Sequence, residues 1–453
     1  MIRYICRSLG VFRDKNTFIN DKKTNYMNST TEKLSSEDII KMEEKYGAHN
    51  YHPLPVVLAK GEGVHVWDIE GKHYYDFLSA YSAVNQGHCH PHIIGALKKQ
   101  AETLTLTSRA FYNDALAPFE KYVTETFGFD KVLAMNSGAE AVETAIKICR
   151  KYAYERNGIP EDQAKIIVCE NNFHGRTTTI ISFSNDDNAR DNFGPYTPGF
   201  VRIPYNDTAA LEEALKQENI AGFLVEPIQG EAGVFVPDDN YMAEARRLCS
   251  ENNVLLIADE VQTGIARTGS LLAVCGDCSC GSKCEQKAPT YVRPDMVVLG
   301  KAISGGVYPV SAVLADNDIM GVIKPGQHGS TFGGNPLAAA VAIAALEVIE
   351  NENLAANAYK LGKLFRKEMK RIIENSDLVN KVRGRGLLNA ILINDREDST
   401  TAWDICMAMK ENGLIAKPTH GNIIRFAPPL VMNEEQLMEC VGIIEKTITE
   451  FKK

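Results

Sequence analysis

A lysine and an aspartate, each placed at the end of a short apolar run, are the residues of this sequence best suited to chemistry. Lys301 follows "DMVVLG", Asp259 ends "VLLIAD", and both runs predict buried strands. An unpaired ammonium is costly to bury, so Lys301 requires a chemical reason for its position. Ligands of parallel sheets bind at the carboxyl ends of the strands, which is where both residues fall.

One cofactor needs both an amine and a carboxylate. The aldehyde of pyridoxal phosphate condenses with a lysine, and its ring nitrogen stays protonated when it pairs with an aspartate. A lysine displaced by substrate can then carry a proton as an acid–base group. Asp259 also has an ordinary alternative, because a carboxylate at a strand end, taken alone, is more often a helix cap or a loop residue.

Two turns are candidates for holding the phosphate of such a cofactor. The stretch "MNSGAEA" ends a predicted strand, and Ser137, Gly138 and Ala139 open a helix there. Backbone N–H groups in the first turn of a helix bind phosphate well. "HGSTFGGNP" is a second candidate, with the hydroxyls of Ser330 and Thr331 and with glycines that permit close approach.

A third motif, "NNFHGRT", places an aromatic and a cation after another predicted strand. Phe173 could stack on a flat ring, although a lone aromatic is more often part of the core. Arg176 could bind a substrate carboxylate through two parallel hydrogen bonds. In "GHCHP", His88 and His90 have a spacing that suggests a metal pair, but we expect a structural role for both.

The elements that must position these residues alternate between strand and helix. Short apolar strands separated by helices predict an α/β protein with a mostly parallel sheet covered on both faces. From about residue 346 onward, long charged helices at 354–374, 401–412 and 434–451 flank short strands, which predicts a smaller α+β domain. A hairpin-like segment before Tyr75 is expected to pack beside it. The predicted parts are a leader or tail (1–27), an N-terminal segment (28–75), a large domain (76–345) and a small domain (346–453).

Charge and hydropathy exclude some classes of function. The 453 residues carry a formal net charge of -9, which argues against a general nucleic-acid binder. No apolar run approaches the roughly 20 residues needed to cross a bilayer, so we expect no membrane partner. Residues 1–20 carry Arg3, Arg7, Arg13 and Lys15 against one acid. This composition resembles a mitochondrial transit peptide and predicts a matrix protein; a disordered tail and a cytoplasmic location are the alternative.

Four of the 11 cysteines lie within ten residues, at Cys275, Cys278, Cys280 and Cys284. Their thiolates could bind zinc, form redox-labile disulfides or lie in an inert surface loop. The Cys-x2-Cys-x-Cys-x3-Cys spacing matches none of the common zinc patterns and lacks a second Cys-x2-Cys knuckle, so we expect no metal site. A metal-binding protein without catalytic activity, built on this cluster, is the alternative from a different functional class.

Seven stretches, in order along the chain, resemble the class-III aminotransferases, which use pyridoxal phosphate and have the aspartate-aminotransferase type of fold. They are "GHCHPHI", "MNSGAEA", "FHGRT", "EPIQGEAG", "IADEVQTGIARTG", "LGKAISGG" and "GSTFGGNPLA". The resemblance extends from about residue 38 to the C-terminus. Four other stretches, "YGAHNYHPLPV", "SAYSAVNQGHCHP", "LTLTSRAFYND" and "AKPTHGNIIRFAPPL", resemble the members of this class that act on ornithine.

The resemblance implies a role around the cofactor for each candidate residue. Lys301 would bond covalently to the aldehyde, Asp259 would pair with the ring nitrogen, and Gln262 would hydrogen-bond the phenolic oxygen. Phe173 would stack on the ring. Gly138 and Ala139 would give backbone N–H groups to the phosphate, with Thr331 arriving from the partner subunit; Ser137 and Ser330 stay candidates beside them. A site completed across subunits implies at least a homodimer.

The ornithine-acting members transfer the δ-amino group of L-ornithine to 2-oxoglutarate, which gives glutamate-5-semialdehyde and glutamate. Arg176 would bind the ornithine carboxylate, with Tyr51 and Tyr81 as walls around the α-amine. Glutamate would bind through Arg425, which Glu231 would mask during the ornithine half-reaction. Within the class, N-acetylornithine and 4-aminobutyrate are the rival donors, and the two tyrosines would crowd an acetylated α-amine.

Overall fold

The computed structural model describes residues 34–279, 281 and 291–452. The chain divides between Val57 and Leu58 into two compact units. In the first unit, α1 (Ser36–Tyr46) begins at Ser35, whose hydroxyl and backbone N–H form a reciprocal capping pair with Asp38. The predicted leader, residues 1–27, lies outside the described residues.

A seven-stranded sheet in the order β4-β10-β9-β8-β7-β5-β6 forms the centre of the second unit. β9, β8, β7, β5 and β6 run parallel, and β10 runs antiparallel to its neighbours β9 and β4. The prediction of an α/β fold with a mostly parallel sheet is therefore confirmed. The strands are β4 (Lys131–Met135), β5 (Lys165–Cys169), β6 (Phe200–Ile203), β7 (Ile220–Val225), β8 (Leu255–Asp259), β9 (Met296–Leu299) and β10 (Ser311–Ala315).

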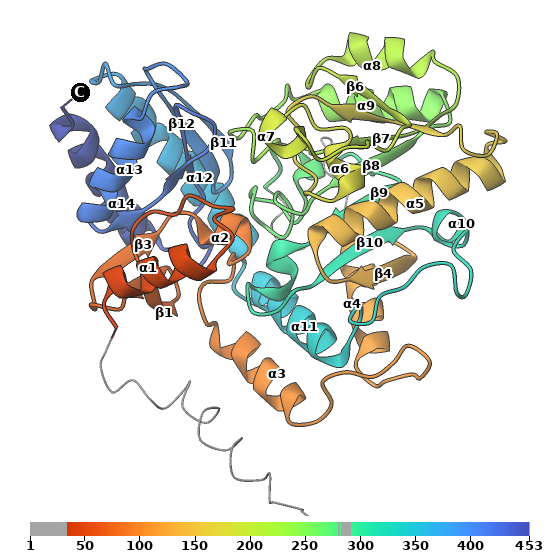
Figure 1. The fold of residues 1–453 in the computed structure, drawn as a ribbon, viewed down its shortest axis with the longest axis horizontal. Helices are drawn as coiled ribbons and strands as arrows, with labels where there is room; N and C mark the ends of the chain where they lie inside the picture. Colours follow the sequence, from red (N-terminus) through yellow and green to blue (C-terminus); the bar gives the residue numbers. More distant parts are fainter. Residues whose placement is uncertain (1–33, 280, 282–290, 453) are drawn as a thin grey trace, which may run out of the picture. The chain divides into compact units, whose positions relative to one another are not determined.

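Helices cover this sheet because its strands are apolar on both faces. Every residue of β7, β8, β9 and β10 is buried, as expected for a sheet packed between two helical layers. α5 (Gly138–Arg156) packs along β7, β9 and β10 (Figure 1). The other helices up to residue 351 are α2 (Ser79–Ser82), α3 (Pro91–Ala101), α4 (Leu116–Phe127), α6 (Thr178–Ile181), α7 (Asp187–Arg190), α8 (Thr208–Leu215), α9 (Tyr241–Glu251), α10 (Asn317–Met320) and α11 (Pro336–Asn351).

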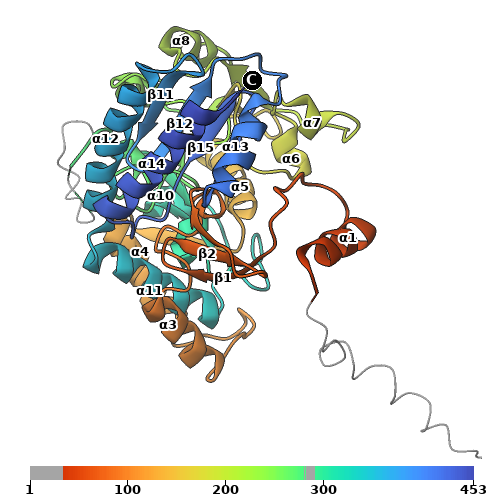
Figure 2. The same cartoon turned by 90° about the vertical axis from the view of Figure 1, so that its left-hand side faces the viewer.

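The C-terminal part forms an antiparallel sheet, β11-β12-β15-β14, with helices packed beside it (Figure 2). The predicted helices 354–374, 401–412 and 434–451 are confirmed to within one residue at each end. The elements are α12 (Leu354–Ile373), β11 (Val379–Arg385), β12 (Leu388–Ile393), α13 (Thr401–Glu411), β14 (Lys417–Pro418), β15 (Ile423–Phe426) and α14 (Glu434–Glu450).

A third sheet joins an early segment of the chain to a late one. The predicted hairpin forms as β2 (His65–Asp68) and β3 (His73–Asp76), with β1 (Leu58–Glu62) on its outer edge. β13 (Leu414–Ile415) pairs in parallel with β3. Residues 58–453 form one compact unit, and α11 runs through the predicted boundary at 345/346, so the division into a large and a small domain stays a prediction.

One turn of the chain has a left-handed backbone conformation. Ser79, Ala80, Tyr81 and Ser82, which make up α2, have φ values of 48°, 46°, 60° and 70°. The left-handed conformation costs non-glycine residues about 1–2 kcal/mol each, so the surrounding contacts must impose it. Nothing in the residue types predicts this turn, because none of the four is glycine.

The guanidinium of Arg267 is fully buried and connects three segments that are distant in sequence. Nη1 donates to the carbonyls of Leu387 (3.0 Å) and Pro428 (2.6 Å), and Nε donates to Oδ1 of Asn85 (3.1 Å). Burial lowers the pKa of Arg267 to about 9. These bonds satisfy a charge that would otherwise be costly inside the protein.

None of the helices in residues 34–279, 281 and 291–452 combines the length and apolar character that crossing a membrane requires.

We expect Arg267→Met to lower the free energy of unfolding by about 3–5 kcal/mol, because it leaves buried acceptors unpaired. Urea unfolding followed by circular dichroism measures this loss. Arg247→Met is the matched control, since Arg247 is exposed and pairs with Glu244 and Glu251 of its own helix, α9. Equal stability of the two variants would contradict the structural role of Arg267.

Candidate active site

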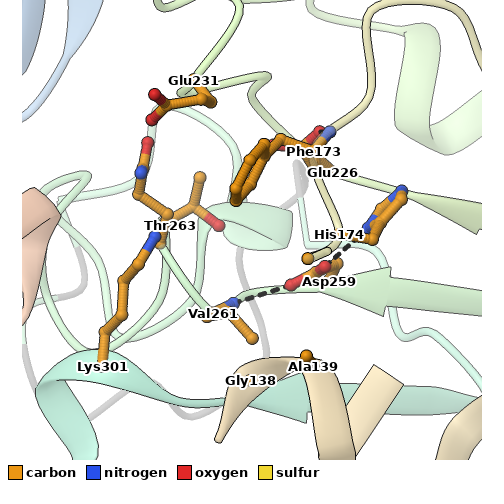
Figure 3. A pocket seen from close by; sticks show the side chains of 12 residues that line it. Gly138, Ala139, Phe173, His174, Glu226, Glu231, Asp259, Val261, Thr263 and Lys301 are labelled. Atoms are coloured by element: carbon orange, nitrogen blue, oxygen red, sulfur yellow. Dashed lines mark hydrogen bonds and ion pairs between the residues drawn. The ribbon is translucent and has the colours of Figure 1, made fainter. Parts of the chain in front are cut away.

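A cavity of about 180 Å³ lies at the carboxyl ends of the central strands (Figure 3). The strands β4, β5, β7, β8 and β9 each end within a few residues of its wall. Lys301 enters it from the side opposite Asp259 and His174 (Figure 3). The predicted residues that line it are Lys301, Asp259, Gly138, Ala139, Phe173, Gln262 and Glu231.

Lys301 opens a short 3-10 helix, η2 (Lys301–Ser304), two residues beyond β9. Its backbone is left-handed, with φ of 46°. Burial, helped by the charge of Arg425, lowers the pKa of Lys301 to about 8. An amine with this pKa is neutral in a useful fraction of molecules near physiological pH, and the neutral amine is the nucleophile.

Asp259 is held on both carboxylate oxygens. Oδ2 forms a 2.6 Å hydrogen bond with Nδ1 of His174, and Oδ1 accepts the backbone N–H of Val261 at 3.0 Å. Burial alone would lower the pKa of His174, but the hydrogen bond and the negative charges of Asp259 and Glu226 outweigh it and raise that pKa. The imidazole therefore favours its charged form, which makes its hydrogen bond to Asp259 charge-assisted. Sequence reasoning missed His174, although it stands beside Phe173.

Glu226 is a second residue that sequence reasoning missed. It follows β7 directly and is buried in the cavity wall. Burial raises the pKa of Glu226 to about 7, and its Oε1 accepts the backbone N–H of Phe173 at 2.9 Å. The available signal was its place at a strand end, in the same stretch, "EPIQGEAG", that supplied Glu231.

Two glycines make room for side chains that line the cavity, Val261 and Gln262. A Cβ atom on Gly138 would lie 2.9 Å from a methyl group of Val261, so no larger residue fits at the start of α5. A Cβ atom on Gly230 would lie 1.6 Å from Oε1 of Gln262. That Oε1 atom is buried and has no hydrogen-bond partner within the described part of the chain. The amide of Gln262 is thus available to a ligand.

An ion pair lies beside the cavity, between Glu231 and a fully buried arginine, Arg425. Nη1 of Arg425 donates to the Glu231 carboxylate at 2.8 Å and to the carbonyl of Gly230 at 3.1 Å. Burial would raise the pKa of Glu231, but the charge and hydrogen bond of Arg425 outweigh it and lower that pKa. The guanidinium also lies 5.2 Å from the ring centre of Tyr81. Three of the predicted substrate residues are therefore in one cluster.

The remaining predicted residues lie outside the cavity wall. Arg176 is exposed and lies 5.6 Å from the ring centre of Phe173, which does line the cavity. Ser137 caps α5 through the backbone N–H of Glu140. Tyr51 belongs to the first unit, where it is exposed, and its predicted role stays a prediction.

The second predicted phosphate turn is also outside the cavity wall of its own chain. Ser330 accepts a hydrogen bond from the Asn136 amide at 2.8 Å, which places it near the start of α5. Thr331 is exposed. Neither residue lines the cavity, and the proposed supply of Thr331 to a partner subunit stays a prediction.

The cysteine cluster falls largely beyond the structural description. Cys275 is buried and Cys278 is partly buried. Cys280 and Cys284 lie outside the described residues. Within residues 34–279, 281 and 291–452, no group of three or more histidine, cysteine, aspartate or glutamate side chains is arranged to hold a metal ion.

Comparison with known proteins places this site in a family. The family model for class-III aminotransferases matches residues 46–448. The mitochondrial ornithine aminotransferase of Drosophila ananassae is 59% identical over 415 residues, which cover 91% of this chain and 91% of that protein.

Solved structures agree in fold. An acetylornithine aminotransferase from Elizabethkingia anophelis is 63% identical, with a TM-score of 0.82, and covers 92% of this chain and 100% of that one. The ornithine aminotransferase of Toxoplasma gondii, described with pyridoxal phosphate at partial occupancy in its active site, is 49% identical with a TM-score of 0.87; 92% of this chain and 95% of that one are covered. The chain therefore belongs to the class-III aminotransferases, a family that uses pyridoxal phosphate.

Proposed function

We propose that this protein transfers the δ-amino group of L-ornithine to 2-oxoglutarate, producing glutamate-5-semialdehyde and glutamate in two half-reactions. The observation that carries this proposal is the Glu231–Arg425 ion pair beside Lys301, with Tyr81 against the arginine. Such a pair lets one site accept two substrates with different charges. The names of the relatives from Drosophila ananassae and Toxoplasma gondii support the same activity.

The cavity residues fit pyridoxal phosphate. The buried Asp259 suits a protonated ring nitrogen, and the unpaired Oε1 marks the Gln262 amide as free for a ligand. Gly138, where a Cβ atom would not fit, and Ala139 place the first turn of α5 in the cavity wall, and the first turn of a helix suits a phosphate. When bound, the cofactor supplies an aldehyde for the amine and an electron-withdrawing ring. We propose Lys301 as its covalent anchor and Phe173 as its stacking partner.

Proton movement in the reaction is assigned to Lys301. Its Nζ atom, with a pKa of about 8, is suited both to take a proton from the amine-bearing carbon of the donor and to return one. The hydrogen bond from His174 holds the carboxylate of Asp259 in place, where it would pair with a protonated ring nitrogen. The two roles are complementary, because a proton leaves carbon more readily when positive charge is held nearby.

The two arginines divide the substrate carboxylates. We propose that Arg176 binds the carboxylate of ornithine, which keeps the δ-amine near Lys301, with Tyr51 and Tyr81 around the α-amine. Arg425 would bind the α-carboxylate of glutamate once Glu231 releases it. Breaking a buried ion pair by removing one partner typically costs about 3–5 kcal/mol, so the incoming carboxylate must replace Glu231 directly.

A second donor deserves a direct test. The Elizabethkingia anophelis structure, at 63% identity, is named as an acetylornithine aminotransferase. N-acetylornithine presents the same reacting amine as ornithine but lacks the charged α-amine. Tyr81 on Arg425 narrows the space for an acetyl group, which is why we place ornithine first.

We also propose a homodimer in the mitochondrial matrix. A homodimer would allow the exposed Thr331 to reach a phosphate held by the partner subunit. The location is supported by the name of the Drosophila ananassae relative and by the basic, acid-poor residues 1–20. Analytical ultracentrifugation and import into isolated mitochondria test the two points.

We expect ornithine to convert the holoenzyme to its aminated form faster than N-acetylornithine or 4-aminobutyrate does. Rapid mixing, with the visible absorbance of the bound cofactor as the signal, measures each rate. Tyr81→Ile should reduce the preference for ornithine about tenfold, equivalent to about 1.4 kcal/mol. Faster reaction with N-acetylornithine would establish the second donor as the substrate instead.

We expect the cofactor to attach to Lys301 faster as the pH rises, with a plateau above about 8. The reason is that only the neutral amine attacks an aldehyde, and the pKa of Lys301 is lowered to about 8. The measurement is the appearance of visible absorbance after pyridoxal phosphate is added to apoenzyme at a series of pH values. A rate that rises up to the ordinary lysine pKa of about 10.4 would refute this pKa.

We expect His174→Ala to slow turnover about 10- to 100-fold, because Asp259 loses a charge-assisted hydrogen bond of about 1.5–3 kcal/mol. Asp259→Asn should be slower still, since it removes the charge itself. Stopped-flow measurement of the ornithine half-reaction tests both. His92→Ala serves as the control, because His92 is an exposed histidine that bonds Glu347 on the helix surface; a loss as large as that of His174→Ala would discredit the comparison.

A further inference from the structure

The segment from Ser79 to His88 contains the left-handed turn of α2, and this turn places the ring of Tyr81 beside the guanidinium of Arg425. Four consecutive non-glycine residues with positive φ persist only where the surrounding structure imposes them. Within the turn, the backbone N–H of Ala83 donates to the carbonyl of Ser79 at 2.9 Å. That hydrogen bond closes the turn but does not determine its handedness. Contacts with residues outside the turn must therefore determine it.

Asp76 contacts both the turn and a histidine. Its Oδ1 atom accepts the backbone N–H groups of Leu78 at 2.8 Å and of Ser79 at 2.9 Å. Its Oδ2 atom bonds Nε2 of His88 at 2.7 Å. Asp76 is buried, so these charge-assisted bonds are not shared with bulk water. The carboxylate thus fixes the direction in which the chain leaves β3.

His88 is itself held in place. Its backbone N–H donates to the carbonyl of Gly63 at 2.8 Å, and its carbonyl accepts the N–H of Gly63 at 3.0 Å. A Cβ atom on Gly61 would lie 2.9 Å from the His88 ring, so the glycine leaves room for the imidazole. The histidine therefore ties Asp76 to the loop between β1 and β2.

The far end of the segment is tied to the lysine turn. The amide of Gln86 donates to the carbonyl of Ala302 at 2.9 Å, one residue after Lys301. The amide of Asn85 donates to the carbonyl of Ile265 at 2.8 Å. Held at both ends, the segment has little freedom to move Tyr81 away from Arg425.

Tyr81 supplements the ion pair that masks Arg425. The guanidinium lies 5.2 Å from the Tyr81 ring centre and 2.8 Å from a Glu231 oxygen. A cation within about 6 Å of an aromatic ring centre is attracted to it. A dicarboxylate that binds Arg425 must therefore compete with two partners, one charged and one aromatic.

We propose that Asp76 and His88 are positioning residues: by fixing the left-handed turn they keep Tyr81 on Arg425 and so disfavour a dicarboxylate relative to ornithine. This inference deepens the proposed function and rests on it for the identity of the donor. The masking of Arg425 can be tested without knowing the amino donor, because it concerns the binding of any dicarboxylate to the holoenzyme.

The test is the affinity of the holoenzyme for glutarate, a dicarboxylate without an amine, measured by calorimetry. His88→Ala should bind glutarate about fivefold to tenfold more tightly, which is the range expected for the loss of one cation–π contact. His88→Gln, whose amide N–H can still reach Asp76, should restore the wild-type affinity. Asp68→Asn is the matched control, because Asp68 is a second buried aspartate on the same hairpin that bonds Lys72 and Tyr74 instead.

Steady-state kinetics supplies a second measurement. His88→Ala should raise the KM for ornithine and lower the KM for 2-oxoglutarate, with a smaller change in kcat. In a Tyr81→Leu background, His88→Ala should have no further effect on glutarate, because the ring through which it acts is gone. If the His88→Ala protein does not fold, Asp76→Asn, which keeps the shape of the side chain, should shift glutarate binding in the same direction.

Unchanged glutarate affinity in folded His88→Ala or Asp76→Asn would overturn the proposal. A full effect of His88→Ala in the Tyr81→Leu background would also overturn it, because the histidine would then act by a route other than the tyrosine. If ornithine proves not to be the preferred donor while the glutarate series behaves as expected, the proposed function fails and the positioning role stands.

Discussion

The common direction of β4, β5, β7, β8 and β9 is the constraint on which this site depends. β4, β5, β7, β8 and β9 all end at one edge of the sheet, so the residues after them converge without any other device. The strand ends contribute four kinds of chemical group: backbone N–H groups after β4, an aromatic ring after β5, carboxylates at β7 and β8, and an amine after β9. The burial that makes the strands stable also removes water from the residues at their ends. The lowered pKa of Lys301 and the raised pKa of Glu226 both follow from that burial.

Selection between substrates also uses residues from outside that sheet. Arg425 comes from β15 of the C-terminal sheet, Glu231 from the loop after β7, and Tyr81 from the turn after β3. The reacting groups are thus placed by one sheet, whereas the residues that select between substrates come from three separate parts of the chain. This separation allows the substrate to change while the chemistry at Lys301 stays the same.

Sequence patterns were sufficient where local rules decide the outcome. The ends of α12, α13 and α14 were predicted to within one residue from their apolar spacing and flanking residues. Lys301 was found because a lysine beside a buried strand is costly, and Asp259 because pyridoxal phosphate needs a carboxylate as well as an amine. The pairing of Glu231 with Arg425, 194 residues apart, came from family resemblance and not from spacing.

Other features could not be predicted because they depend on contacts between distant residues. His174 and Glu226 stand in motifs that were identified, but their roles follow from the hydrogen bond to Asp259 and from burial, which no spacing reveals. The left-handed turn at Ser79–Ser82 has no glycine to signal it. Its hand is set by Asp76 and by His88, which lies twelve residues farther along the chain.

The buried guanidinium of Arg267 limits where the chain can be divided into fragments. Its hydrogen-bond partners are far apart in the sequence: Asn85 precedes the strands of the central sheet and Pro428 follows them. No cut in the chain between those positions leaves a fragment with all of these bonds. The C-terminal region therefore supplies two of the acceptors of this guanidinium, and the hydrogen bonding of Arg267 is complete only in a chain that includes Pro428.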